Sequence, residues 1–118
     1  MKLMIAGSRS IQNFNLAPYI PAEAHSIICG GAYGIDRLVE EYADQHRLSK
    51  YIIRPLYSLY GRAAPIKRNR QMVDMADAIL VVWDGVSTGT QYTIRYAKEA
   101  NKPLTVIEIP SSSLLQKE

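Results

Sequence analysis

The sequence holds very little cysteine and histidine. Cys29 is the only cysteine among the 118 residues, so no disulfide can form within the chain. The two histidines, His25 and His46, are far apart, and no group of Cys and His has the spacing of zinc ligands. We therefore expect no metal site and no bound cofactor, and we expect Cys29 to be a small buried apolar residue.

Long hydrophobic runs are also missing. No apolar stretch approaches the roughly 18 residues that a membrane span requires, and the apolar start "KLMIAG" is too short for a secretory signal. We therefore expect a cytoplasmic protein without a membrane partner. A chain of 118 residues has room for one core, which predicts a single domain over residues 2–109 and a tail over residues 110–118.

Acidic residues are absent from one segment of the chain. Seven lysines and arginines but no aspartate or glutamate lie between Arg47 and Arg70, whereas the rest of the chain has seven basic and eleven acidic residues. A basic segment of this kind suits a polyanionic partner such as a phosphate group, a nucleotide or a nucleic acid. Alternatively, these basic residues only form a solvated surface and bind no partner.

Short apolar runs alternate with helical patterns along the chain. The runs are rich in Ile and Val and lack in/out alternation, which is typical of strands covered on both faces. We therefore predict an α/β fold: a Rossmann-like five-stranded parallel sheet with helices on both faces and the strand order 3-2-1-4-5. The expected strands cover residues 2–7, 26–30, 51–54, 78–83 and 104–109.

Three segments between these runs are predicted to be helices. The evidence is either an amphipathic pattern or a residue that is favoured in the first turn of a helix. The connection between the first two strands has a weaker signal. There we expect a short helix around residues 13–17, which Pro18 and Pro21 would cut. The three main helices are expected over residues 35–46, from Pro65 onward, and from about 88 to 100.

Three loops rich in glycine and hydroxyl residues follow the ends of predicted strands. In a parallel sheet these ends share one edge, and open α/β sheets bind ligands there, where the strand order reverses. Glycine lets the backbone approach a ligand closely, and a helix that begins at this edge offers unpaired N–H groups to a phosphate. We therefore expect a phosphate-bearing ligand. The loops are "GSRS" (7–10), "GGAYGID" (30–36) and "DGVSTGT" (84–90).

Several side chains at this edge suit a nucleotide. Arg9 and Arg68 supply positive charge, and Tyr33 is a candidate to stack on a base. Asp36 suits a ribose or base contact, or else it only stabilises the first turn of its helix. The candidate hydroxyl donors are Ser8, Ser87, Thr88 and Thr90.

Known catalytic and cofactor fingerprints are absent. The stretch "GGAYG" is not G-x-G-x-x-G, and "GVSTGT" lacks the lysine of a P-loop. No Ser-His-Asp or Cys-His set stands out, so the catalytic residues stay unassigned. These absences argue against a standard NAD site and a standard ATP hydrolase.

The motifs "GSRS", "ICGGAYGIDRLVEEYA" and "GRAAPIKRNRQMVDMADAILVVWDGVSTGTQYTIRYA" together resemble the SLOG superfamily, and most closely its small YspA/YpsA-related single-domain branch. The resemblance covers about residues 3–107. It implies a Rossmann-like fold that binds a nucleotide or nucleotide-derived ligand. Relatives include the DNA-processing protein A family, which binds single-stranded DNA, and the Lonely Guy phosphoribohydrolases, which release a base from a nucleoside monophosphate. The positions that match the family motifs are Gly7, Ser8, Arg9, Gly30, Gly31, Gly34, Asp36, Arg68, Asn69, Asp84, Ser87, Gly89 and Thr90.

One departure from this pattern bears on catalysis. The phosphoribohydrolases carry P-G-G-x-G-T-x-x-E, whose glutamate acts in glycosidic cleavage, whereas this sequence has Thr93 at that position and no opening proline. We therefore expect a small nucleotide-binding protein. The alternatives are a nucleotide N-glycosidic hydrolase and a protein that binds single-stranded nucleic acid through residues 47–70. The resemblance is also compatible with a homo-oligomer.

Overall fold

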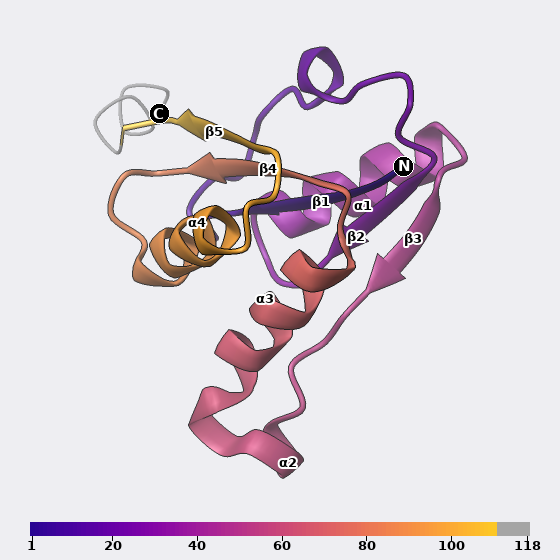
Figure 1. The fold of residues 1–118 in the computed structure, drawn as a ribbon. Coiled ribbons are helices and arrows are strands. Elements are labelled where there is room, and N and C mark those ends of the chain that lie inside the picture. The colour runs from indigo at the N-terminus through magenta and orange to yellow at the C-terminus, as the bar shows by residue number, and fades with distance from the viewer. Residues whose placement is uncertain (111–118) are drawn as a thin grey trace.

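The central feature of the structure is a five-stranded parallel sheet with the order β3-β2-β1-β4-β5 (Figure 1). The computed structural model describes residues 1–110, so the predicted tail, apart from Pro110, lies outside the described residues. The strand order confirms the prediction from the sequence. The strands are β1 (Lys2–Gly7), β2 (Ser26–Cys29), β3 (Ser49–Ile52), β4 (Ala78–Trp83) and β5 (Leu104–Glu108).

Helices cover both faces of the sheet, as predicted. Residues of α1 pack on one face, and residues of α3 and α4 pack on the other. A shorter helix, α2, and two 3₁₀ turns, η1 and η2, lie in the connections. No helix within residues 1–110 is long and apolar enough to cross a membrane. The helical elements are η1 (Ala17–Tyr19), α1 (Ile35–Gln45), α2 (Tyr57–Tyr60), η2 (Gly61–Ala63), α3 (Ala64–Met75) and α4 (Thr88–Glu99).

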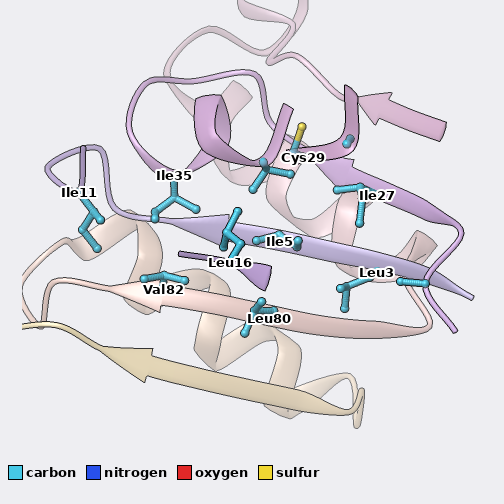
Figure 2. Close-up of a cluster of buried hydrophobic side chains, with 12 residues drawn as sticks. Leu3, Ile5, Ile11, Leu16, Ile27, Cys29, Ile35, Leu80 and Val82 are labelled. Atoms are coloured by element: carbon cyan, nitrogen blue, oxygen red, sulfur yellow. The ribbon is translucent and has the colours of Figure 1, made fainter. Parts of the chain in front are cut away.

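The core consists of two apolar layers, one on each face of the sheet. Leu3 and Ile5 of β1 point into the layer beneath α1 (Figure 2). Met4, which lies between them in the strand, belongs to the layer beneath α3 and α4. Successive strand side chains face opposite ways, so a strand with helices on both sides is apolar at every position. This holds for β4 and, after their first residues Lys2 and Ser26, for β1 and β2, whereas the edge strands β3 and β5 are mostly exposed.

The third strand begins and ends earlier than predicted. We expected residues 51–54, but β3 pairs in register with β2 over Ser49–Ile52. Beyond the strand, the side chain of Arg54 donates a hydrogen bond to the carbonyl oxygen of Gly31 at 3.2 Å. Arg54 therefore fastens the loop after β2 and is not part of the strand.

The predicted short helix around residues 13–17 is wrong. The chain there has no regular structure until η1 (Ala17–Tyr19), and Pro18 lies inside this turn and does not interrupt it. A proline at the start of a helical turn costs little, because the first N–H groups have no partner within the turn. The segment is fixed by its apolar side chains, since Ile11 and Leu16 are buried in the layer beneath α1.

One part of the chain extends away from the sheet. The arm, which we define as residues 55–63, contains α2 and η2 and lies at the far end of α3 (Figure 1). Neither α2 nor η2 contributes a buried residue.

Candidate functional site

The loops after β1, β2 and β4 meet at the edge hollow, a cavity of about 400 Å³ beside α3 and the start of α4. The structure thus brings together segments that lie far apart in the sequence, at the sheet edge where the strand order reverses. Nine of the predicted site residues line this hollow. They are Gly7, Arg9, Asp36, Arg68, Asn69, Ser87, Thr88, Gly89 and Thr90.

The first turn of α4 forms one wall of the hollow. Thr88, Gly89 and Thr90 line the cavity, and Ser87 is the N-cap residue. No side chain within residues 1–110 caps this turn, and the Ser87 hydroxyl instead donates a hydrogen bond to Asp84. The N–H groups of a first helical turn have no partner inside the helix, so this turn presents free donors and the positive end of the helix dipole to the hollow.

Asp84 holds the loop before α4 and does not line the hollow. Its carboxylate accepts hydrogen bonds from the N–H groups of Val86 and Ser87 at 2.9 and 2.8 Å, and from the hydroxyls of Ser10 and Ser87 at 2.8 and 2.7 Å. Burial alone would raise the pKa of Asp84, but these bonds hold the pKa well below its usual range. We expected Asp84 to contact the ligand, whereas its oxygens are occupied in fixing the loop.

Ser8 also lies behind the hollow. It is buried, and its Oγ accepts a hydrogen bond from the backbone N–H of Asp84 at 3.0 Å and lies 3.5 Å from the hydroxyl oxygen of Thr90. Ser8 therefore links the loop after β1 to the loop after β4 and to α4. Its position sets the relative placement of Arg9 and Thr90, both of which line the hollow.

Arg68 reaches from α3 to the ends of two strands. Its Nη1 donates hydrogen bonds to the carbonyl oxygens of Gly30 at 2.8 Å and Ile53 at 3.3 Å, and its Nε donates to Oδ1 of Asn69 at 2.8 Å. Burial lowers the pKa of Arg68, and the negative charge of Asp36 opposes this shift. Arg68 thus has a structural role that the sequence did not reveal, and it places a cationic group in the wall of the hollow.

Asp36 sits opposite Arg68 at the start of α1. It is buried, and its Oδ2 accepts a hydrogen bond from the backbone N–H of Ala32 at 3.1 Å. Burial raises the pKa of Asp36, although the Ala32 bond and the charge of Arg68 act in the other direction. Both sequence interpretations of Asp36 are compatible with this position, because it fastens the loop after β2 and also lines the hollow.

The glycines after β2 shape the loop without lining the hollow. A Cβ atom on Gly30 would lie 2.5 Å from Nη1 of Arg68, and Gly34 has a φ of +72° and backbone atoms of Ser8 and Arg9 within 2.7 Å of its Cβ position. Gly31 also stays outside the hollow. These residues let Arg68 and the loop after β1 approach closely, and we find no ligand-facing surface on them.

Tyr33 lies away from the edge hollow. Its side chain is 78% exposed and belongs to a separate shallow hollow beside Arg37, Glu40 and Asp44 of α1. The expectation that Tyr33 stacks on a base in the same site as the phosphate is therefore not supported by its position.

Six lining residues were not among the predicted site residues. Pro65 and Met72 have the helical spacing i and i+7 with Arg68 and Asn69 between them, so this face of α3 could have been found from its periodicity. Thr93 lies one helical turn after Gly89 in α4, and its hydroxyl donates a hydrogen bond to the carbonyl oxygen of Gly89 at 3.2 Å. The six are Ala6, Ser10, Ala32, Pro65, Met72 and Thr93.

The described chain offers no metal site and no exposed thiol. Within residues 1–110 no group of three or more His, Cys, Asp or Glu side chains could hold a metal ion. Cys29 is buried in the core, where burial raises the pKa of its thiol to about 12. Comparison of the chain with models of protein families, with curated proteins and with solved structures found no match.

Proposed function

We propose that this protein binds a small nucleotide or nucleotide-derived molecule in the edge hollow, with a phosphate group against the first turn of α4. The observation that carries the proposal is the uncapped start of this helix, which faces the hollow through Thr88, Gly89 and Thr90. A phosphate would accept hydrogen bonds from the free N–H groups and interact with the positive end of the helix dipole.

The side chains around this turn supply charge and hydroxyl donors. Arg9 and Arg68 line the same hollow, and both are suited to charge-assisted hydrogen bonds with phosphate oxygens. The space above the turn is open, because a Cβ atom on Gly89 would meet no atom within 4 Å. A cavity of about 400 Å³ is within the range of small-molecule sites.

We place the rest of the ligand against α3, because this helix lines the hollow. Pro65 and Met72 provide apolar surface on this helix, and Asn69 lies between them with an amide group. A sugar and base placed here would lie between α3 and the loop after β2, with Asp36 within the same hollow.

Calorimetric titration with each of the four nucleoside 5′-monophosphates tests this proposal. We expect saturable binding of at least one, and a loss of at least tenfold in affinity for Gly89→Leu, whose side chain would fill the space in front of the first turn. Gln91→Leu is the matched control, since Gln91 is exposed on the same helix and lies outside the hollow. No binding of any nucleotide, or equal effects of both variants, would contradict the proposal.

An N-glycosidic hydrolase is the second candidate, and one observation favours it. Asp36 is the one carboxylate that lines the edge hollow within residues 1–110, and burial raises its pKa, which suits a general acid. Glycosidic cleavage ordinarily needs a second carboxylate, however, and Thr93 occupies the position expected for it. Nucleoside 5′-monophosphates are incubated with the protein for a long time, and free base is detected by chromatography. Release of base by the wild type that is abolished in Asp36→Asn would establish the hydrolase.

A further inference from the structure

The cations of the basic segment take separate places in the structure. Lys50 forms a salt bridge with Asp44 at 2.8 Å, and Arg68 donates a hydrogen bond to the carbonyl oxygen of Gly30 beside the edge hollow. Arg54, Lys67 and Arg70 line a second hollow of about 500 Å³ between the end of β3, the arm and α3, and Arg68 lies in the wall of both hollows.

This second hollow is strongly cationic. Among residues 1–110 one carboxylate lines it, Asp74, which accepts a hydrogen bond from the hydroxyl of Tyr96 at 3.1 Å. Arg70 is held in place because its Nε donates to the hydroxyl of Tyr92 at 2.7 Å. Arg62 adds a further exposed cation on the arm itself. Positive charge therefore exceeds negative charge along the whole surface from Arg54 to Arg70.

Exposed rings lie beside these cations. Tyr57 is 56% exposed and Tyr60 is 43% exposed, and the Lys67 ammonium lies 5.2 Å from the centre of the Tyr60 ring. The leucines of the arm, Leu56 and Leu59, are also exposed. A surface of uncovered apolar and aromatic side chains on a projecting arm indicates a binding partner, because nothing in the described chain covers it.

We propose that this arm surface binds single-stranded nucleic acid. The cations would contact successive phosphates, and the two tyrosine rings would stack on unpaired bases. Bases within a duplex are already stacked, so rings exposed on a surface favour a single strand. We define the arm surface by Arg54, Tyr57, Tyr60, Arg62, Lys67 and Arg70.

A second copy of the chain fits this surface less well. Two arms would bring like charges together, which opposes their association. The exposed carboxylates of α1 offer no strongly acidic face either, since Glu40 and Glu41 lie beside Arg37 and Asp44 is paired with Lys50. The charge of the arm surface is better matched by a row of phosphates.

The salt dependence of binding gives a quantitative test. Fluorescence anisotropy with a labelled 15-nucleotide oligothymidylate measures the affinity of the full chain between 50 and 200 mM NaCl. Four phosphate contacts predict a slope of log K against log salt of about −2.8, which is a loss of about fiftyfold over this range. The double variant Arg62→Ala/Lys67→Ala should reduce the slope to about −1.4. Arg95→Ala/Lys98→Ala, which removes two exposed cations of α4, is the matched control and should leave the slope unchanged.

The tyrosines and the edge hollow provide two further comparisons. Tyr57→Ala/Tyr60→Ala should weaken binding at least tenfold without changing the slope, whereas the corresponding phenylalanine variants should retain the affinity. Gly89→Leu should leave oligothymidylate binding intact, so a failure here is distinguishable from a failure of the proposed nucleotide site. The proposal is overturned by no binding at 50 mM NaCl, by a slope that Arg62→Ala/Lys67→Ala does not change, by tighter binding of a duplex of equal length, or by a dimer that covers the arm in sedimentation experiments.

Discussion

Nη1 of Arg68 on α3 donates a 2.8 Å hydrogen bond to the carbonyl oxygen of Gly30 at the end of β2. The bond joins α3, which lines the edge hollow, to the loop after β2, and a Cβ atom at Gly30 would lie 2.5 Å from the same nitrogen. The position of the arginine therefore depends on the glycine, and the wall of the candidate site depends on both.

Arg68→Ala should destabilise the fold as well as weaken ligand binding. The change removes hydrogen bonds from a charged donor to the carbonyl oxygens of Gly30 and Ile53, so we expect a decrease of about 1.5–3 kcal/mol in the free energy of unfolding. Urea denaturation measures this change. Arg62→Ala is the control, and because Arg62 is exposed its effect should stay within about 0.5 kcal/mol. Equal effects of the two variants would mean that the Arg68 bonds contribute nothing to stability.

Two glycine substitutions should have opposite effects. Gly34→Ala should lower the free energy of unfolding by at least about 2 kcal/mol, because Gly34 has a φ of +72° and backbone atoms stand 2.6–2.7 Å from its Cβ position. Gly89→Ala should stabilise the protein by up to about 1 kcal/mol, since Gly89 lies within α4 and its Cβ position is open. Thermal unfolding of both variants checks the pair. A destabilised Gly89→Ala would show that the first turn of α4 is not the regular helix described above.

Asp84 should make the protein sensitive to acid. Its pKa is depressed in the folded state, so its contribution to stability is complete above the ordinary aspartate pKa of 3.8 and is lost as the pH falls below that value. Unfolding measured between pH 7 and pH 2 should therefore show a smaller acid-dependent loss for Asp84→Asn than for the wild type. Asp77→Asn is a useful comparison, because Asp77 also has a lowered pKa but is bound to the N–H of Lys2, at the opposite end of β1. An unchanged acid profile in Asp84→Asn would contradict the role of its four hydrogen bonds.

Cys29 should not react with thiol reagents while the protein is folded. Burial raises the pKa of its thiol to about 12, and the residue is fully covered by the core. Since the thiolate is the reactive form, labelling with a disulfide reagent at pH 8 should require unfolding. The rate of labelling should therefore increase with urea concentration in parallel with the unfolding transition, and rapid labelling without urea would mean that β2 opens locally.

The sheet could be predicted from the sequence because the central strands are almost continuously apolar. Leu3, Met4 and Ile5 illustrate this, since neighbouring side chains fill different core layers. The loop residues were harder to place. The sequence correctly predicts that Asp84 lies at the carboxyl edge of the sheet. Only the structure shows that its oxygens accept hydrogen bonds from the N–H groups of Val86 and Ser87.

The direction of a side chain in a loop depends on such local bonds and on backbone angles that the residue type does not fix. Tyr33 is the clearest case, because its position in a glycine loop suggested the ligand site, whereas its ring lies outside the edge hollow. The spacing of Ser87 three residues after Asp84 was a usable signal for a turn closed by an aspartate. By contrast, the bond from Arg68 to Gly30 joins distant segments and depends on how α3 packs.

The central claim is that a phosphate binds at the first turn of α4, and the most direct test is an NMR titration that follows the backbone amide groups. Adding a nucleoside 5′-monophosphate to ¹⁵N-labelled protein should shift the amide signals of Thr88, Gly89 and Thr90 most strongly and saturably, because their N–H groups would donate to the phosphate. The signals of Tyr33 and of the arm should move little. Saturable shifts centred outside the edge hollow, or no shifts with any of the four nucleotides, would contradict the account.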